Sequence, residues 1–379
     1  MKLKKLLYLL LSDIHLGHDI NKTSDIIKNL DTFFLKYKKD IIKVQYIFIL
    51  GDIFDKLLSN SNKDSVLIYG WLSRLVLFCK EYNIKLRILE GTPGHDHKQV
   101  SIIDRIITDL KIDINYKYYD KLDIEINDEL SILYVPDEWN HKAEDTFKEV
   151  KELLKEKNLT KVDLCIMHGA FTYQIPYIQH EAFHLEKDYL SITNYTINIG
   201  HVHNHSQFEK IIVPGSFDAL TFIDEDVTKG GIIVTLDLVN KSFKYNFLSN
   251  TNSLVFHTIY VDDIDHKEMI SLLDKYNKEY KDKKIHVRLY SKDKSNKLAL
   301  SLRELSSDYP NLIIKYTNKI EKDTTNVKDI IKKSTINKTV LRLDKSNITD
   351  IVIEELNNKE IDTDIQKIVL KELELLLAT

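Results

Sequence analysis

Short apolar runs alternate along the first third of the chain with segments in which apolar residues recur every three or four positions. An uninterrupted run is typical of a strand buried on both faces, and the three-four spacing is typical of an amphipathic helix. The apolar runs end at Leu11, Leu50 and Leu89. Helices are predicted at residues 24–37, 66–79 and 101–110. Strands and helices that alternate in this way predict an α/β half.

After residue 116 the pattern changes to shorter strands. Residues 122–126 and 130–135 flank Asn127-Asp-Glu, which is typical of a hairpin. A charged helix is predicted at 145–157, and further strands at 162–167, 196–199, 206–213, 231–236 and 243–247. We expect these later strands to form a mixed, partly antiparallel second sheet that packs on the first. The predicted fold class is therefore α/β, a two-sheet sandwich flanked by helices, with residues 1–252 as one domain.

The last third of the chain predicts a small domain, a linker and a helical end. A small α+β domain is predicted at 253–320, with strands at 254–261, 284–290 and 312–316 and a helix at 267–280. Residues 321–344 are rich in Lys, Thr and Asn and are typical of a linker. Residues 345–379 carry two short apolar stripes at helical spacing. Two such helices cannot bury their stripes alone, so we expect this helical hairpin to dock on a partner.

Composition narrows the class of protein. The 379 residues are 43% hydrophobic and 30% charged, with a formal net charge of -4, which fits a globular protein without a general affinity for nucleic acid. Any contact with DNA must then come from a local patch. Cys79 and Cys165 both lie in apolar runs, which favours free thiols in a reducing compartment. The leucine run near the amino terminus stops at Leu11 with no cleavage site after it, so we expect a cytoplasmic protein without a membrane segment.

Residues of the metal-ligand type follow the predicted strands. Asp13 and His15 come directly after the first strand, and alternate residues of an extended segment face the same way. The later strand ends carry Asp52, then His95 with Asp96, then His168, and finally His201 with His203. A single Asp-x-His or His-x-His is usually a surface accident, but a series of strand ends that all deliver carboxylate and imidazole predicts a binuclear metal site.

The order of these motifs resembles the calcineurin-like metallophosphoesterases. Within that superfamily the chain is similar to the SbcD type of double-strand-break repair nuclease. The resemblance rests on Ser12-Asp-Ile-His-Leu-Gly17, Gly51-Asp-Ile-Phe-Asp55, Gly200-His-Val-His203, Pro214-Gly-Ser216 and Lys229-Gly230. It continues into the small domain and the two terminal helices.

The resemblance implies a role for each ligand. Asp13, His15 and His203 would hold one ion, His168 and His201 the other, and Asp52 would bridge them. Ligands without thiolate suit Mn²⁺ or a similar divalent cation. Two such ions, about 3.5–4 Å apart, activate water and stabilise the displacement at phosphorus. His95 would stabilise the transition state or protonate the leaving group, with Asp96 as its orienting partner.

One position departs from the family pattern. The family has an asparagine before the catalytic histidine, which gives a neutral oxygen to the second ion, and this chain has Gly94 there. Thr92, His97, a backbone carbonyl or a water could fill the place. The Gly-Thr-Pro form is similar to that of phage-encoded members. We therefore expect weaker affinity at the second site.

Several polar residues near the motifs have less specific interpretations. His18, His97 and His205 have no clear ligand position, so supporting or plain loop roles are expected. Asp55 either supports a ligand or caps the following turn. Structural roles are expected for His180 and His184.

Basic residues gather in the small domain. They include Lys283, Lys284, Arg288 and Lys292. A run of charge is most often a solvated face, but a phosphodiesterase site nearby makes this run a candidate grip on the DNA backbone.

The resemblance implies a Mn²⁺-dependent DNA exonuclease and endonuclease, the nuclease subunit of an SbcCD-like complex. The helices at 345–379 would bind the coiled-coil base of an SbcC-like ATPase, and the helices at 66–79 and 101–110 would form a homodimer. Two alternatives stay open. One is a phosphomonoesterase or cyclic-nucleotide phosphodiesterase built on the same site. The other is a DNA-tethering scaffold whose metal site has decayed.

Overall fold

The computed structural model of the chain describes residues 5–59, 61–127, 130–137, 140, 142–174, 183–281, 283–291 and 306–317. The chain divides into two compact units, Met1–Asn318 and Lys319–Thr379. The linker predicted at 321–344 and the helices predicted at 345–379 lie outside the described residues. Within the described part, no helix has the length and apolar character needed to cross a bilayer.

The first sheet has six strands in the order β12-β11-β1-β2-β3-β4. The parallel strands are β1 (Lys5–Leu11), β2 (Tyr46–Ile49), β3 (Lys85–Leu89) and β4 (Tyr116–Tyr119). The antiparallel strands are β11 (Gly230–Asp237) and β12 (Ser242–Ser249), and β11 pairs with β1. The carboxyl ends of the four parallel strands therefore lie along one edge of this sheet.

The place of β11 and β12 differs from the sequence-based expectation. We expected residues 231–236 and 243–247 in the second sheet, and this was wrong, because they extend the first. Along β11, Ile232 and Val234 face the core between the sheets and Ile233 faces the helical side. A strand that is apolar on both faces fits the interior of either sheet, so its pattern alone does not indicate the partner strand.

The second sheet also has six strands, in the order β5-β6-β7-β8-β10-β9. Its strands are β5 (Asp123–Ile126), β6 (Ser131–Val135), β7 (Val162–His168), β8 (Thr193–Gly200), β9 (Ser206–Phe208) and β10 (Ile211–Val213). β6, β7, β8 and β10 run parallel to one another, and β5 and β6 form the predicted antiparallel hairpin. This sheet too presents several strand carboxyl ends at one edge.

Alternate residues of the strands build two apolar layers around the first sheet. Tyr8, Leu10 and Phe48 pack between the two sheets, whereas Leu9 and Ile47 face the helices. All five side chains are fully buried. Burial on both faces explains why these strands read as continuous apolar runs in the sequence.

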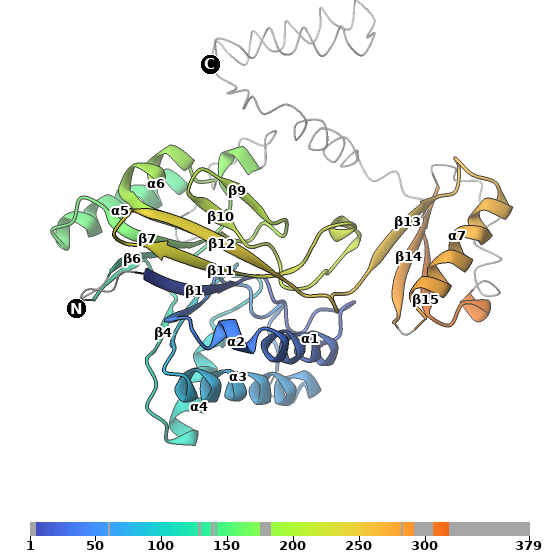
Figure 1. Cartoon of the computed structure of the whole chain (residues 1–379), viewed down its shortest axis with the longest axis horizontal. Helices are drawn as coiled ribbons and strands as arrows, with labels where there is room; N and C mark the ends of the chain where they lie inside the picture. Colours follow the sequence, from blue (N-terminus) through green and yellow to red (C-terminus); the bar gives the residue numbers. More distant parts are fainter. Residues whose placement is uncertain are drawn as a thin grey trace, which may run out of the picture. The chain divides into compact units, whose positions relative to one another are not determined.

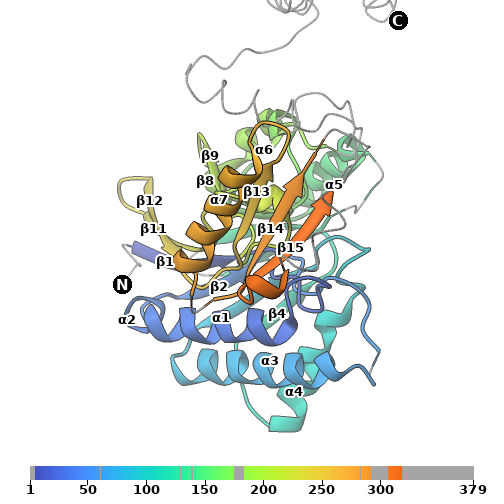
Figure 2. The ribbon, with the colours of Figure 1, turned by 90° about the vertical axis from the view of Figure 1, so that its right-hand side faces the viewer.

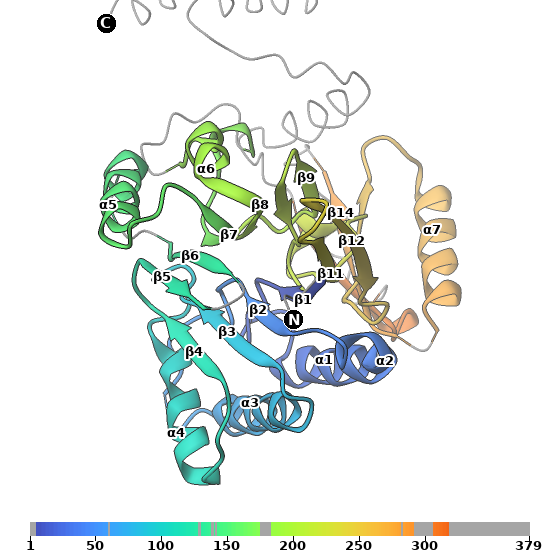
Figure 3. The same ribbon diagram turned by 60° about the vertical axis from the view of Figure 1, so that its left-hand side comes forward.

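Helices cover the outer face of each sheet (Figures 1 and 3). The first sheet is covered by α1 (Thr23–Lys36), α2 (Lys38–Ile41), α3 (Lys63–Glu81) and α4 (Ile102–Leu110). The second is covered by α5 (Ala143–Glu156) and α6 (Glu186–Ile192). Short 3-10 turns occur at η1 (Gln99–Ser101), η2 (Thr172–Gln174) and η3 (Phe222–Asp224). The predicted α/β sandwich flanked by helices is confirmed.

A third, three-stranded sheet follows the sandwich in the chain. It contains β13 (Phe256–Tyr260), β14 (Ile285–Tyr290) and β15 (Leu312–Thr317), all parallel, with α7 (His266–Glu279) on one face (Figure 2). It has its own apolar core, which includes Ile259, Leu273 and Val287. The predicted small α+β module is therefore present, although it belongs to the same compact unit as the sandwich.

Candidate metal centre

The strand registers bring the predicted ligands to one edge of the sandwich. In the first sheet Leu11 lies opposite Ile49, so Asp13 and Asp52 leave neighbouring strands near the same level. In the second sheet His168 lies directly opposite Gly200, which precedes His201. Because the carboxyl ends of parallel strands meet at one edge, residues remote in sequence become neighbours.

Asp13, His15 and His203 form the first group of candidate ligands. Each offers one ligand atom, and these atoms lie within 4.8 Å of one another. His203 Nε2 is 3.8 Å from Asp13 Oδ1, and the rings of His15 and His203 are 5.3 Å apart. Asp13 also accepts hydrogen bonds from the backbone N–H of His201, which holds the carboxylate in place.

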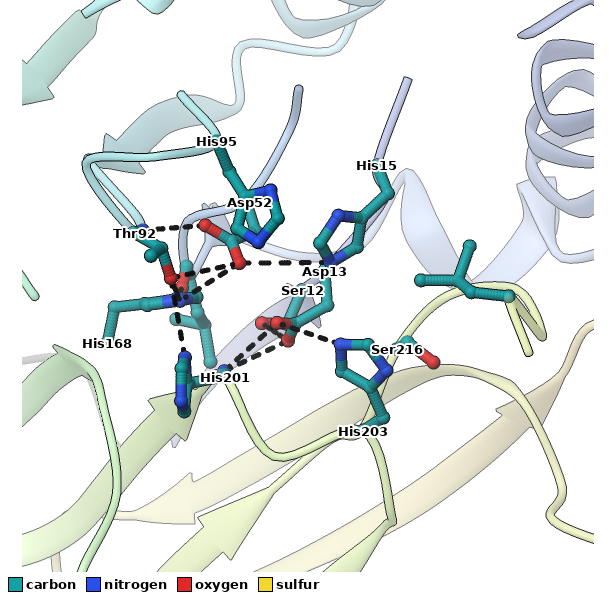
Figure 4. A network of polar contacts seen from close by, with 12 residues as sticks. Ser12, Asp13, His15, Asp52, Thr92, His95, His168, His201, His203 and Ser216 are labelled. Atoms are coloured by element: carbon teal, nitrogen blue, oxygen red, sulfur yellow. Dashed lines mark hydrogen bonds and ion pairs between the residues drawn. The ribbon is translucent and has the colours of Figure 1, made fainter. Parts of the chain in front are cut away.

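Asp52, His168 and His201 form the second group, again with ligand atoms within 4.8 Å. His168 Nε2 lies 3.4 Å from Asp52 Oδ2, and His15 Nε2 of the first group lies 3.7 Å from the same oxygen. Asp52 therefore faces both groups, as the bridging position requires (Figure 4). The structure brings together all six predicted ligands.

Hydrogen bonds turn the histidines toward the centre. His168 Nδ1 donates to the backbone carbonyl of Leu50, which leaves Nε2 directed at Asp52. His15 Nδ1 lies 3.1 Å from the Asp55 carboxylate, which leaves Nε2 directed at Asp52 as well. Fixing one ring nitrogen in this way is the usual means of presenting the other to a metal ion. Asp55 therefore supports a ligand, which was one of its two predicted roles.

The donor set fits divalent cations. Within the described residues, His15 Nε2 is buried with no hydrogen-bond partner, although it points at Asp52. A buried polar atom of this kind is costly unless something binds it. The groups are carboxylates and imidazoles without thiolate, which suits Mn²⁺ and similar ions. Together, these buried Asp and His side chains can hold a metal ion.

The backbone at the ligands is strained. Asp13, His15, Asp52 and His201 all have positive φ values, of 50°, 54°, 52° and 91°. Residues with a side chain seldom adopt this left-handed conformation, and such strain concentrates at functional sites. Four ligand positions in this conformation indicate that the loops are shaped by the site and not by local preference.

The centre concentrates negative charge. Burial alone would raise the pKa of Asp52, but His168 and His15 outweigh it and lower that pKa. Burial would lower the pKa of His168, yet the Asp52 carboxylate raises it well above its ordinary value. The pKa of His15 is raised as well, because Asp55 and Asp52 outweigh its burial. The carboxylates that raise the pKa of these histidines would also attract a cation.

Glycines allow the closest approaches in the centre. A Cβ atom on Gly51 would collide with the ring of His168, and its φ of +91° disfavours any side chain. A Cβ atom on Gly91 would collide with the backbone and carboxylate of Asp52. The glycines of these strand ends therefore serve the packing of two ligands.

His95 lies beside the ligands, but its partner is not the predicted one. Its Nδ1 donates to the backbone carbonyl of Asp55 at 2.6 Å, and its ring is 4.9 Å from that of His15. Asp96 is fully buried and accepts backbone N–H bonds from Asp52 (3.0 Å), Phe54 (2.9 Å) and Gly91 (2.8 Å). The prediction that Asp96 orients His95 is thus corrected, because its carboxylate ties together the two ligand-bearing loops instead.

Burial raises the pKa of Asp96 to about 7, and the charge of Asp52 adds to the effect. The N–H bonds from Phe54 and Gly91 act in the opposite direction. Because the carboxyl group accepts three backbone N–H bonds from two loops, its role is structural.

Two further residues, Thr92 and Asp137, contact the candidate ligands of the second group. Thr92 Oγ1 lies 3.2 Å from Asp52 Oδ2 and 3.4 Å from both His168 Nε2 and His201 Nδ1. Asp137, which was not predicted at all, lies 3.9 Å from His201 Nδ1. It follows β6 by two residues, so its only sequence signal was a carboxylate just after an apolar run, and the parallel pairing of β6 with β7 brings it to the ligands.

A cavity of about 220 Å³ opens beside several of the candidate ligands. It is lined by His15, His18, Asp52, Asp55, His95, His201, His203, Leu220 and Thr221. A larger cavity, of about 480 Å³, is lined by residues that precede β3 and β4, such as Asn83 and Asn115. It therefore lies at the opposite edge of the first sheet, away from the ligands.

The remaining histidines have mainly structural contacts. His205 Nδ1 donates to the carbonyl of Val213, and His184 is buried beside Tyr189. His97 is exposed. The predicted His180 lies outside the described residues.

The predicted basic patch is only partly free for a ligand. Lys283 donates to the carbonyl of Ser253, and the Arg288 guanidinium stacks on Phe222 at 4.7 Å. Lys284 is exposed. Lys292 lies outside the described residues. DNA binding by this patch stays a prediction.

Comparisons with solved structures find likenesses of low sequence identity. No family model and no curated protein matches the chain. The crystal structure of TT1561 of Thermus thermophilus is 11% identical, with a TM-score of 0.37, and the match covers 64% of this chain and 99% of that one. Another crystal structure is 14% identical over 65% of this chain and 100% of its own, also with a TM-score of 0.37. Likenesses at this level say nothing about function.

Proposed function

We propose that this chain is a Mn²⁺-dependent DNA nuclease of the SbcD type, within the calcineurin-like metallophosphoesterases. The observation that carries the proposal is the two neighbouring ligand groups, Asp13–His15–His203 and Asp52–His168–His201, which a third group of His15, Asp52 and His95 connects. Asp13, His15 and His203 would hold one cation, and His168 and His201 the other. A cation pair so held supplies an activated water and neutralises the charge that develops on phosphate during an in-line displacement.

His95 can act on the leaving group. Its Nδ1 is occupied by the carbonyl of Asp55, so Nε2 is the nitrogen that remains for the substrate. His95 lines the cavity beside Asp52, where a bound phosphodiester would lie. Positioned there, a protonated Nε2 donates its proton to the leaving oxygen, which is general-acid catalysis.

His18 offers a neutral hydrogen-bond donor to the same cavity. Its Nδ1 accepts the backbone N–H groups of Ile20 (3.3 Å) and Asn21 (3.1 Å), so the proton of the neutral ring lies on Nε2. Burial lowers the pKa of His18, which favours the neutral ring. Such a donor suits a phosphate oxygen of the substrate.

Other features of the chain fit the assembly implied by this type of nuclease. On α3, the proposed dimer helix, Val66 is 74% exposed, Leu67 43% and Leu77 46%. Apolar side chains exposed on one helix favour a protein partner. The helices predicted at 345–379 would bind the SbcC-like ATPase, and the third sheet would contact DNA.

One assay tests the proposal. Purified protein with Mn²⁺ is offered a labelled duplex, a DNA hairpin, a single strand and a small phosphomonoester, with and without the partner ATPase. EDTA and a His95→Gln variant serve as controls against a contaminating nuclease. Cleavage of DNA that both controls remove supports the proposal. Hydrolysis of the monoester alone favours a phosphomonoesterase, and inactivity on every substrate favours the scaffold.

A further inference from the structure

Asp137 reaches the centre because β6 runs parallel to β7. Val135 lies opposite Met167, so the residues after β6 emerge beside His168. Asp137 is the second residue after Val135, and its side chain is 13% exposed. The second sheet thus delivers a carboxylate as well as imidazoles to the edge of the sandwich.

Four polar groups of this part of the centre surround the hydroxyl of Thr92. Its hydroxyl lies 3.2 Å from Asp137 Oδ2 and 3.2 Å from Asp52 Oδ2. Thr92 Oγ1 also lies 3.4 Å from His168 Nε2 and 3.4 Å from His201 Nδ1. A hydroxyl has one proton to donate and two lone pairs to accept with, so it cannot bond with all four groups at once. The two contacts to carboxylate oxygens are also longer than an ordinary O–H···O bond of about 2.7–2.8 Å.

We propose that the hydroxyl of Thr92 and the carboxylate of Asp137 are oxygen donors of the second cation, together with His168 and His201. The inference rests on the cation pair of the proposed function. It extends that proposal, because it assigns a carboxylate that belongs to none of the recognised motifs. Carboxylate and hydroxyl oxygens favour Mn²⁺ or Mg²⁺ over softer ions.

The surroundings of Asp137 agree with this role. A Cβ atom on Gly169 would come within 3.3 Å of Asp137 Oδ1, and the φ of Gly169 is +135°. The glycine after His168 therefore leaves room for the carboxylate.

Thr92 can also replace the asparagine ligand that the family has at the position of Gly94. Gly94 is exposed, and a Cβ atom there would meet nothing within 4 Å. Thr92, in contrast, contacts three of the candidate ligands of the second cation. If Thr92 and Asp137 bind the second cation, its affinity should not be weaker, contrary to the expectation from Gly94.

The test measures the affinity of the full chain for Mn²⁺ by titration calorimetry. Electron paramagnetic resonance measures the magnetic coupling between the bound ions. The wild type is expected to bind two ions that show coupling through Asp52. Asp137→Ala should weaken one of the two by roughly 10- to 100-fold, and Asp137→Asn, which keeps an oxygen, by less. Thr92→Val, which has the same shape without the hydroxyl, should weaken the same ion.

Asp19→Asn is the matched control for a change of charge near the cavity. Asp19 is exposed and pairs with Lys56, so its loss should leave both ions bound. Two coupled ions with unchanged affinity in Asp137→Ala and Thr92→Val would overturn the inference and leave the proposed function standing. A wild type that binds no Mn²⁺ would overturn both. If Asp137→Ala does not fold, Thr92→Val alone decides.

Discussion

His95 is positioned by Asp55 through the main chain: its Nδ1 donates a hydrogen bond of 2.6 Å to the Asp55 carbonyl. The carboxylate of Asp55 lies 3.1 Å from His15 Nδ1. One residue thus orients a candidate ligand with its carboxylate and the candidate acid with its carbonyl. The two functions can be separated by mutation, because a side-chain substitution leaves the carbonyl in place.

Replacing His95 should impair chemistry without removing the cations. His95→Gln is expected to lower kcat on a DNA substrate by about 10²- to 10⁴-fold, the usual contribution of a general acid. Binding of Mn²⁺, measured by calorimetry, should stay near the wild-type value. A variant that loses both ions would place His95 among the ligands instead.

Replacing the Asp55 side chain should have the opposite effect. Asp55→Ala removes the group that orients His15, so the affinity of the first cation is expected to fall by roughly 10- to 100-fold. At saturating Mn²⁺ much of the activity should return, because the carbonyl that holds His95 remains. Failure of excess Mn²⁺ to restore activity would show that the carboxylate has a more direct role.

Asp96 should matter for stability. Asp96→Ala leaves three buried N–H groups without an acceptor, and each costs about 1–3 kcal/mol. The free energy of unfolding, measured in urea with EDTA present, should fall by about 3 kcal/mol or more. Asp96→Asn keeps one oxygen acceptor and should cost less. Equal stability of Asp96→Ala and wild type would contradict the bracing role.

His286 should make the third sheet sensitive to acid. Burial, followed by the charge of Lys315, lowers the pKa of His286 to about 4. The unfolded chain, with an ordinary pKa near 6.5, then binds a proton that the folded chain does not between these values. Stability should therefore fall as pH drops from about 6.5 toward 4.

The measurement is urea unfolding of wild type and His286→Phe at pH 7.5 and pH 5. Between these values, His286 is expected to account for about 1–2 kcal/mol of the loss, and His286→Phe should show that much less. The same pH dependence in both proteins would show that the ring is protonated in the folded state.

Of the predicted DNA contacts, Lys284 is the most direct to test. Lys283 and Arg288 have partners within the protein, whereas Lys284 is exposed. Lys284→Ala should weaken binding equally for different DNA sequences and lower the slope of log K against log salt by about one. Lys278→Ala, an exposed lysine of α7, is the control. Equal salt slopes for Lys284→Ala and wild type would remove this residue from the interface.

Much of the centre could be predicted from the sequence because a strand end is easy to recognise. Asp13, Asp52 and His168 each close an apolar run, and parallel strands bring such ends together. The pairing of β11 with β1 could not be predicted, because Ile232 and Ile233 suit either sheet. It depends on tertiary contacts.

The partner of Asp96 and the position of Asp137 could not be predicted, because both depend on which loops lie side by side in the folded chain. Asp96 sits next to His95 in the chain, but its carboxylate turns to three backbone N–H groups that only the folded loops bring within reach. Asp137 follows a strand that reads as part of a hairpin, and its neighbour β7 is parallel to it. No local pattern shows that pairing.

The most direct test is anomalous diffraction from crystals grown with Mn²⁺. Two peaks about 3.5–4 Å apart are expected, with the Asp52 carboxylate between them. One should lie against His15 and His203, and the other against His168 and His201. A single peak, or peaks away from Asp52, would contradict a cation pair built from these strand ends.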